Sequence, residues 1–398
     1  MIGAGSVLLA AGLLLLLLAV HPFVTYPLSL RLLARLRPAP LRSGPVGGRA
    51  AICVCAYNEE RVIRAKVENM LSMRAAWPEL QVLVYVDGNG DGTADIVRGF
   101  GDAVTLVAST ARLGKTHGMN TLVSMAQAEY LVFSDANVMF APDAVPRLLA
   151  AFADPDVGCV CGHLIYTKPG ENVTAATGSL YWRLEERIKA DETATGSAVG
   201  ADGSIFALRR SLHVPPPPDL IDDMFVSLKV LAGGKRVVRA ADAYAYEEAV
   251  SRPAEEFRRK IRIACQAFNV HRALWPELRR MRGIDLYKYV SHKLLRWMTI
   301  YALVGGAALV LAGTGMLFGW TAFLALLGLG LVGAAAIAVL PMGLAATGRD
   351  VLGAFVATGI GVWRSVRGER FQTWTPPASA RATPSPAQPS PAQPSHGH

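Results

Sequence analysis

Charged residues are scarce in this 398-residue chain. Asp, Glu, Lys and Arg together make up 18% of it, whereas hydrophobic residues make up 52%. This balance argues against a purely water-soluble protein and favours a membrane protein with a soluble part. The length allows a soluble domain of about 200–250 residues beside additional elements.

Cysteine is also scarce, and no two of the five cysteines are spaced as Cys-x-x-Cys. The sequence therefore lacks the pair that is typical of structural zinc sites and of thioredoxin-like redox sites. Four of the cysteines alternate with other residues in strand-like runs. We predict buried, reduced thiols in a cytoplasmic domain. These residues are Cys53, Cys55, Cys159, Cys161 and Cys265.

Three common phosphate and calcium motifs are missing. Residues 114–116 read Gly-Lys-Thr, but Ser109 stands where a P-loop requires its first glycine. The loop at residues 87–93 begins like an EF-hand, yet its twelfth position is Arg98, where calcium requires a glutamate. Its glycines also lack the spacing of a dinucleotide-binding loop.

The net charge is +9, which raises the question of a nucleic-acid partner. The basic residues gather beside apolar segments, at residues 31–49, 258–296 and 364–370. Attraction to a membrane surface explains this distribution better. We therefore expect the lipid bilayer as a partner and no nucleic acid.

The N-terminus carries a long apolar run at residues 5–20. A secretory signal peptide is one reading, but no basic segment precedes the run and no clear cleavage site follows it. Five arginines follow between residues 31 and 49. By the positive-inside rule, residues 1–28 are expected to be a transmembrane anchor with the N-terminus outside, and residues 29–49 a basic linker on the cytoplasmic side.

A second apolar region follows residues 251–296, which we expect to form basic interfacial helices. Residues 297–366 contain two candidate spans and a marginal third segment at 351–362, which either lies in the interface or spans. Residues 367–398 form a basic stretch and then a Pro-rich repeat that is expected to be disordered.

Residues 50–250 alternate between strand and helix patterns. Parallel sheets with helices on both faces give this alternation, so the sequence predicts an α/β domain of Rossmann-like type. The expected strands are residues 50–56, 81–86, 104–107 and 130–134, and the expected helices are residues 62–73, 93–100 and 118–127.

Polar side chains follow several of these strands, and Asp135 and Asn137 follow the fourth. The carboxyl ends of strands in open α/β sheets bind ligands at a common edge. Two hard oxygen donors there suit Mg²⁺ or Mn²⁺ with a diphosphate. The alternative is a strand end capped by an Asx turn, and the Asp-x-Asn pattern alone favours neither.

Three further groups of residues each allow two interpretations, one functional and one purely structural. Lys115 precedes a helix and could bind phosphate, or it is a solvated loop lysine. Asp222 and Asp223 open a helix as capping acids, or one of them is a general base. The basic run 258–262 is a diphosphate clamp, or it is a membrane-surface helix face.

Taken in order, these motifs resemble the family 2 glycosyltransferases. The resemblance covers about residues 48–375, including residues 371–376. It extends to the membrane-embedded branch that contains cellulose, hyaluronan, chitin-oligosaccharide and poly-N-acetylglucosamine synthases. The motifs that carry it are Ala56-Tyr57-Asn58-Glu59-Glu60, residues 86–93, Gly114-Lys115 with Asn120, Ser134-Asp135-Ala136-Asn137 and Asp222-Asp223.

The resemblance implies a GT-A fold and an inverting transfer from a nucleotide-diphospho-sugar, with a UDP-sugar as the expected donor. Asp223 would be the catalytic base. Asp135 and Asn137 would hold Mg²⁺ or Mn²⁺. The acceptor would be a glycan or a lipid-linked molecule in cell-surface or exopolysaccharide synthesis, and the oligomeric state is not implied. The donor would contact Ala56, Tyr57, Glu59, Asp87, Lys115, Asp135, Arg259 and Arg262.

The chain departs from the family pattern in three places. Asn137 replaces the second acid of the Asp-x-Asp metal motif. The Thr-Glu-Asp motif reads Ile221-Asp222-Asp223. In the Gln-x-x-Arg-Trp motif of the processive synthases, Arg262 is kept and Ile263 replaces the tryptophan. Two alternatives to a simple transferase therefore stay open: a processive synthase that exports its product, and a non-catalytic membrane subunit of an export complex.

Overall fold

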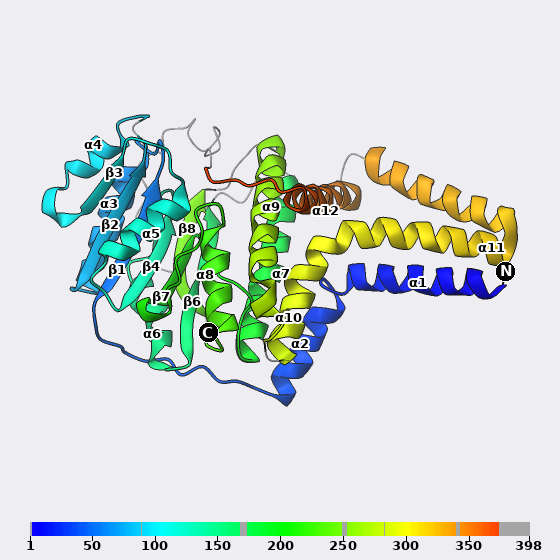
Figure 1. The fold of residues 1–398 in the computed structure, drawn as a ribbon, viewed down its shortest axis with the longest axis horizontal. Coiled ribbons are helices and arrows are strands. Elements are labelled where there is room, and N and C mark those ends of the chain that lie inside the picture. The colour runs from blue at the N-terminus through cyan, green and yellow to red at the C-terminus, as the bar shows by residue number, and fades with distance from the viewer. Residues whose placement is uncertain are drawn as a thin grey trace.

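A computed structural model describes residues 2–88, 90–167, 173–248, 253–281, 283–339 and 343–373. Figure 1 shows a sheet domain at one end of the molecule and a bundle of long helices at the other. The expected Pro-rich tail and the last residues of the 371–376 motif lie outside the described residues.

The sheet has eight strands in the order β3-β2-β1-β4-β7-β6-β8-β5. The four strands β3, β2, β1 and β4 run parallel, and β7 joins β4 in the antiparallel sense. β6 runs antiparallel to β7 and parallel to β8, and β5 closes the edge antiparallel to β8. The strands are β1 (Ala50–Ala56), β2 (Leu80–Asp87), β3 (Thr105–Ser109), β4 (Tyr130–Asp135), β5 (Met139–Phe140), β6 (Val157–Thr167), β7 (Ile205–Arg209) and β8 (Arg236–Glu248).

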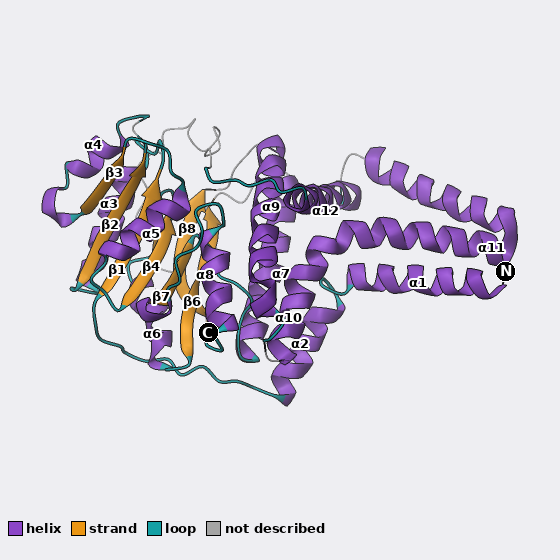
Figure 2. Ribbon diagram, in the orientation of Figure 1, coloured by secondary structure: helices purple, strands orange, loops and turns teal. Residues whose placement is uncertain are grey.

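Helices cover both faces of this sheet (Figure 2). The predicted mostly parallel α/β fold is therefore confirmed, with boundaries shifted by a few residues. The largest shift is in α5, which begins at Lys115 rather than at residue 118. The helices of this domain are α3 (Ile63–Ser72), α4 (Thr93–Arg98), α5 (Lys115–Met125), α6 (Ala144–Ala150), α7 (Val173–Ala194), α8 (Asp222–Ala232) and α9 (Pro253–Leu278).

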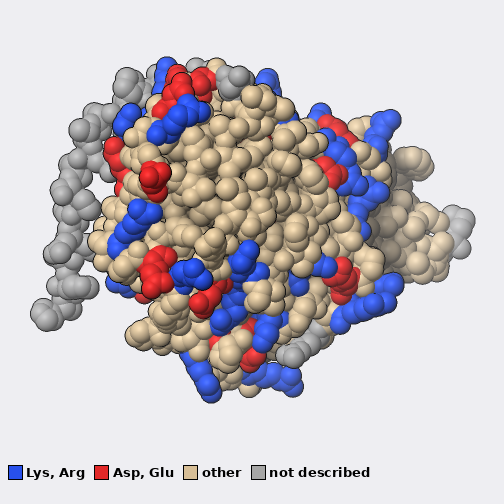
Figure 3. All heavy atoms as spheres, turned by 60° about the vertical axis from the view of Figure 1, so that its left-hand side comes forward, with Lys and Arg blue, Asp and Glu red and all other residues tan. Residues whose placement is uncertain are grey.

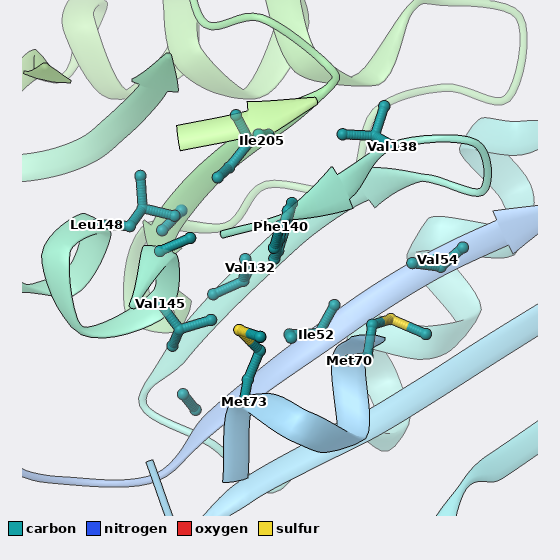
Figure 4. Close-up of a cluster of buried hydrophobic side chains, with 14 of the residues drawn as sticks. Ile52, Val54, Met70, Met73, Val132, Val138, Phe140, Val145, Leu148 and Ile205 are labelled. Atoms are coloured by element: carbon teal, nitrogen blue, oxygen red, sulfur yellow. The ribbon is translucent and has the colours of Figure 1, made fainter. Parts of the chain in front are cut away.

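Strand β1 is completely buried and contributes side chains to two hydrophobic cores, because alternate side chains point to opposite faces of the sheet. Ile52 and Val54 pack with α3 and α6 on one face, in the cluster that Figure 4 shows. Cys53 and Cys55 pack with α5, α8 and α9 on the other. All five cysteines are buried and free, as predicted.

The helix α9 belongs partly to this second core. Phe268, Val270 and Leu274 are buried in it, so the expected basic interfacial segment also forms one wall of the sheet domain. Likewise, α2 (Thr25–Leu36) is helical through the first part of the expected linker. The basic segments are therefore packed elements of the fold.

Two long apolar helices, α1 (Ile2–Val20) and α11 (Leu295–Val339), lie side by side (Figure 1). Among the described residues, two helices are long and apolar enough to cross a membrane: α1 and the stretch that contains most of α11. Helix α11 is kinked at Gly319, which has a φ of 84° and splits the helix into two arms. The two expected spans at the C-terminal side correspond to these arms.

The marginal segment 351–362 lies in α12 (Leu344–Val366), which crosses the direction of α1 and α11 in Figure 1. Its residues Ala357 and Val362 are buried, and Gly361 lies against the backbone of α9. Leu352, Val356 and Trp363 are exposed. The segment thus packs one side on α9 and exposes apolar side chains on the other, which both the interfacial and the spanning reading allow.

A buried polar network joins the apolar helices to the sheet domain. His292 lies in a π-helical turn (Val290–Leu294) that connects α10 (Gly283–Tyr289) to α11. Its Nδ1 lies 2.7 Å from Glu192 Oε1 and its Nε2 lies 3.0 Å from Glu185 Oε1, both in α7. Tyr26 of α2 donates a hydrogen bond to Glu192. These bonds fix the orientation of the helical bundle on the domain.

Candidate active site

The carboxyl ends of β1, β2 and β4 meet at the centre of the sheet. In the strand register Ala56 lies opposite Val86, and Cys55 lies opposite Asp135. The strand order reverses at β1, since β2 continues on one side and β4 on the other. Ligands bind at such switch points in α/β sheets. The expected residues Ala56, Asp87 and Asp135 thus lie together at the carboxyl edge of the sheet.

Tyr57 follows β1 at the same edge of the sheet. The guanidinium of Arg112 lies 3.7 Å from the centre of its ring, a cation–π contact. The main-chain N–H of Glu59 donates to Thr93 Oγ1 at 2.9 Å, which ties this loop to the loop after β2. The sequence analysis predicted that Tyr57 contacts the donor but predicted no role for Arg112, which lies against the Tyr57 ring.

Asp87 is fully buried at the end of β2. Its Oδ1 accepts hydrogen bonds from the main-chain N–H groups of Leu113 (2.7 Å) and Gly114 (3.1 Å). Asp87 was expected to contact a nucleotide; in this structure its carboxylate anchors the loop before Lys115. Gly114 has a φ of 94°, which L side chains rarely adopt, and it ends that loop as the N-cap of α5.

Lys115 points from the start of α5 into the middle of the site. Its Nζ lies 2.7 Å from Asp135 Oδ1 and 3.8 Å from Asp222 Oδ2. Burial by itself would lower the pKa of Lys115, but Asp135, Asp222 and Asp223 outweigh it and hold the pKa above its ordinary value. Lys115 is therefore a fixed positive charge, and the solvated-loop reading of this lysine is wrong.

Asp223 lies in the first turn of α8, and its Oδ1 accepts the N–H of Met224. Burial raises the pKa of Asp223 to about 7, Asp222 adds to the rise, and Lys115 opposes it. Gly203 lies directly against this carboxylate, because a Cβ there would stand 2.7 Å from Asp223 Oδ2. The group is thus a carboxyl that exchanges its proton near neutral pH, as a general base requires.

Asp135 and Asn137 lie together at the end of β4. Asn137 Nδ2 donates to Glu247 Oε1 at 3.1 Å. Burial, with a contribution from Asp135, raises the pKa of Glu247 to about 7. No group of three or more His, Cys, Asp or Glu side chains within the described ranges is arranged to hold a metal ion. This donor set fits a hard cation that takes most of its ligands from phosphate and water, as Mg²⁺ does.

Arg259 and Arg262 project from α9 toward the same region. Arg259 pairs with Glu256 at 3.2 Å, and Arg262 donates to Gln266 Oε1 at 3.0 Å. Burial lowers the pKa of Arg262, with Arg259 acting in the same direction and Asp135 against it. Arg262 therefore lies close enough to Arg259 and to Asp135 for their charges to interact.

Lys66 is a buried residue that the sequence reasoning missed. It donates from α3 to Ser134 Oγ at 2.8 Å and to the carbonyl of Val138. Burial lowers its pKa to about 7, although Asp135 opposes the shift. These hydrogen bonds, to the residues before and after them, support the turn that carries Asp135 and Asn137. In the sequence it was one lysine in a helical pattern, with no signal to distinguish it.

Comparison with known proteins agrees with this arrangement. Residues 51–214 match the model of the family described as "Glycosyl transferase family 2". The chain is 27% identical over 121 residues to the poly-beta-1,6-N-acetyl-D-glucosamine synthase of Staphylococcus epidermidis, which covers 30% of this chain and 29% of that protein. It is 23% identical over 211 residues to the hyaluronan synthase of Streptococcus pyogenes, 50% of this chain and 49% of that protein. The chain thus spans about half or less of the length of these curated relatives.

Among solved structures, the chain resembles the mannosyltransferase PcManGT from Pyrobaculum calidifontis, whose structure contains GDP-Man and Mn²⁺. The TM-score is 0.69 at 22% identity, and the match covers 91% of this chain and 99% of that chain. At this identity the likeness concerns the fold. The expected GT-A fold is confirmed, and residues 51–214 match the family 2 glycosyltransferases, which the sequence motifs also resemble.

Proposed function

We propose that the protein is an inverting glycosyltransferase that moves a sugar from a nucleotide-diphospho-sugar, with UDP as the expected nucleotide, to a hydroxyl of a glycan or lipid-linked acceptor. The observation that carries this proposal is the position of Lys115 between Asp135 and the pair Asp222–Asp223. One crevice thereby combines a fixed cation, a metal-type carboxylate and a carboxyl with a pKa near neutrality.

The donor's diphosphate is proposed to lie between Lys115 and the arginines of α9. Lys115 and Arg262 would supply positive charge, and Arg259 would add a guanidinium suited to phosphate oxygens. The base and ribose would lie beside Ala56, Tyr57 and Glu59, near Arg112. Asp87 would act through the loop that it anchors. This arrangement would hold the anomeric carbon near Asp223 and limit its motion.

Mg²⁺ or Mn²⁺ held by Asp135 and Asn137 would neutralise the charge that develops on the leaving nucleoside diphosphate. Lys115 is proposed to share this task, since it already faces Asp135 at 2.7 Å. For the amide of Asn137, the oxygen is the candidate ligand, because its nitrogen is engaged with Glu247.

Asp223 is proposed to take the proton of the acceptor hydroxyl as its oxygen attacks the anomeric carbon from the side opposite the diphosphate. The carbon–oxygen bond to the acceptor forms as the bond to the diphosphate breaks, so the anomeric configuration inverts. A pKa of about 7 leaves Asp223 largely ionised just above neutrality while it remains basic enough to accept a proton.

The apolar helices support a membrane location for this activity. We propose that α1 and both arms of α11 span the bilayer, with the sheet domain on the cytoplasmic side and the N-terminus on the opposite side. The arginines after α1 and near α12 favour that orientation. On the face in Figure 3, basic and acidic residues are interspersed around the rim, so this face has no broad basic patch.

A donor screen tests the proposal. The full-length protein, purified in detergent or nanodiscs, is incubated with UDP- and GDP-sugars, Mn²⁺ and a membrane lipid extract, and the released nucleoside diphosphate is measured. We expect release with one class of donor and none from Asp223→Asn, which should still bind the nucleotide. Wild-type protein that binds no nucleotide in calorimetry would favour the non-catalytic membrane subunit instead.

Product length is the second readout of the same assay. In the family motif, position 263 holds a tryptophan, and this chain has Ile263 on α9. We therefore propose single or few additions rather than a long exported polymer. Gel or mass analysis that shows a ladder of long chains would favour the processive synthase.

A further inference from the structure

Glu247 lies where the metal motif of this chain has lost a charge. The residue is near the end of β8, 110 positions after Asn137, yet its Oε1 accepts a hydrogen bond from Asn137 Nδ2 at 3.1 Å. The antiparallel pairing of β5 with β8 creates this contact, because Met139 lies opposite Tyr246. The strand pairing therefore delivers a carboxylate to the side of Asn137.

The direction of this hydrogen bond matters for the metal site. A carboxylate accepts and does not donate when ionised, so Glu247 selects the nitrogen side of the Asn137 amide. The oxygen of Asn137 then faces away from Glu247 and is the atom that remains for a cation. An amide without such a partner would present either its oxygen or its nitrogen.

The charge balance points the same way. Asp135 is the only acid of the Asp-x-Asn motif, and it is paired with Lys115 at 2.7 Å. Arg259 and Arg262 add positive charge close by. Asp222 and Asp223 also act on Lys115, and Glu256 pairs with Arg259, so these acids are already engaged with the cations of the site. Glu247 is the acid that contacts the Asp-x-Asn motif itself, at Asn137.

We propose that Glu247 is the second carboxylate of the metal–diphosphate site, supplying from β8 the negative charge that Asn137 lacks and holding the Asn137 oxygen toward the cation. This inference rests on the proposed function. The acidic charge of the usual two-acid motif has, in this chain, moved from position 137 to a strand on the other half of the sheet.

A charge-relocation experiment tests the inference. Binding of Mn²⁺ is measured by electron paramagnetic resonance of the free ion, with UDP or GDP present, for the wild type, Glu247→Gln, Asn137→Asp and the double variant. Glu247→Gln keeps an acceptor oxygen but removes the charge. We expect it to weaken Mn²⁺ binding about 10–100-fold, the range for residues that support metal ligands. In the double variant, the added Asn137→Asp change should restore most of the loss.

Asp242→Asn is the matched control. Asp242 is an exposed acid on the same strand and pairs with Arg147 at 2.7 Å, on the outer surface of the domain. The Asp242→Asn variant should bind Mn²⁺ as tightly as the wild type. This result would show that the effect of Glu247→Gln depends on where the charge is lost and not on the loss of one negative charge in general. Melting temperatures of all variants, taken without metal, identify any loss of folding.

Two results would overturn the inference. In the first, Glu247→Gln binds Mn²⁺ as tightly as the wild type. In the second, the double variant is folded but binds Mn²⁺ no more tightly than Glu247→Gln does. Both leave the proposed function intact if wild-type protein still transfers sugar with Mn²⁺. The opposite pattern, in which the wild type binds neither nucleotide nor Mn²⁺, would instead remove the proposed function itself.

Discussion

Lys115 Nζ lies 2.7 Å from Asp135 Oδ1, so the cation of the site and its first metal-type carboxylate form an ion pair with each other. Asp222 Oδ2 stands 3.8 Å from the same nitrogen and has no hydrogen-bond partner among the described residues. One lysine thus balances two acids. A diphosphate with its cation would compete for both partners of the pair, so donor and metal are expected to bind together more tightly than either alone.

Lys115→Met tests this role of the cation. Loss of a charged hydrogen-bond donor costs about 1.5–3 kcal/mol, so nucleotide affinity should fall about 10–100-fold. Lys115 also holds down the pKa of Asp223, and its removal should shift the rising limb of the pH–rate profile to higher pH. Lys229→Met, which loses a surface pair with Glu277 on the same domain, is the control. Unchanged affinity and pH profile in Lys115→Met would contradict the assignment.

Asp223→Asn should abolish transfer and stabilise the fold. The ordinary pKa of Asp is about 3.9, and burial raises it to about 7 in the folded protein. Between these values the folded state holds a proton that the unfolded state has released, so wild-type stability falls as the pH rises through this window. The amide of Asn does not titrate. We expect the melting temperature of the variant to exceed that of the wild type by about 2–4 °C or more at pH 8, with a smaller gain at pH 5.

Gly114 is the third position to test, since its backbone supports the loop before Lys115. Its φ of 94° and ψ of 159° belong to a region that is nearly exclusive to glycine. A Cβ would also stand 2.1 Å from the carbonyl oxygen of Gln372, whose side chain donates to Leu113 O at 3.0 Å. Gly114→Ala should therefore weaken nucleotide binding measured by calorimetry. Gly234→Ala has a similar positive φ of 79° with nothing within 4 Å, and should lose stability without losing affinity.

The fold could be predicted from the sequence because its central strands are simple. Strand β1 is buried on both sides and reads as one apolar run, with a helical pattern after it at residues 62–73. The start of α5 was placed three residues too late, because Gly114 and Lys115 resemble a loop until the positive φ of Gly114 is known. The second half of the sheet was not predicted, since β6, β7 and β8 pair over long distances in the chain.

Candidate site residues could be predicted where one short motif contains all the chemically relevant side chains. Asp135 and Asn137 lie two residues apart at the end of a predicted strand, so the sequence offered them as oxygen ligands, although the pattern alone favoured neither a metal site nor an Asx turn. Glu247 and Lys66 reach the same turn from β8 and α3. Nothing in their local sequence marks them, because tertiary packing alone creates these contacts. Asp87 was expected directly after the second strand and is the last residue of β2. Its hydrogen bonds from two main-chain N–H groups could not be predicted, because they depend on the path of a loop 26 residues away.

Thr116→Val tests how Asp223, the proposed catalytic base, is held in position. Thr116 Oγ1 donates to the carbonyl of Leu220 at 2.7 Å, two residues before Asp222, and thereby ties α5 to the segment that enters α8. Valine has nearly the same shape without the donor. We expect kcat to fall about tenfold, the equivalent of about 1.4 kcal/mol, with little change in nucleotide affinity. Thr121→Val is the control, because the hydroxyl of Thr121 donates to the carbonyl of His117 within α5. Equal losses in both variants would place the effect in helix stability.

Gly306→Leu tests the packing of the apolar helices. A Cβ at Gly306 would lie 2.9 Å from the carbonyl oxygen of Gly12, and one at Gly12 would lie 2.8 Å from that of Gly306, so α1 and α11 approach to backbone contact there. Small residues permit such contact between membrane helices. Leucine should push the helices apart and cost about 1–3 kcal/mol, as overpacking does, which lowers the melting temperature in detergent. Gly328→Leu lies in the second arm of α11 with nothing within 4 Å and should melt like the wild type. If both variants melt alike, α1 does not pack on the first arm of α11, and the proposed arrangement of the spans must be revised.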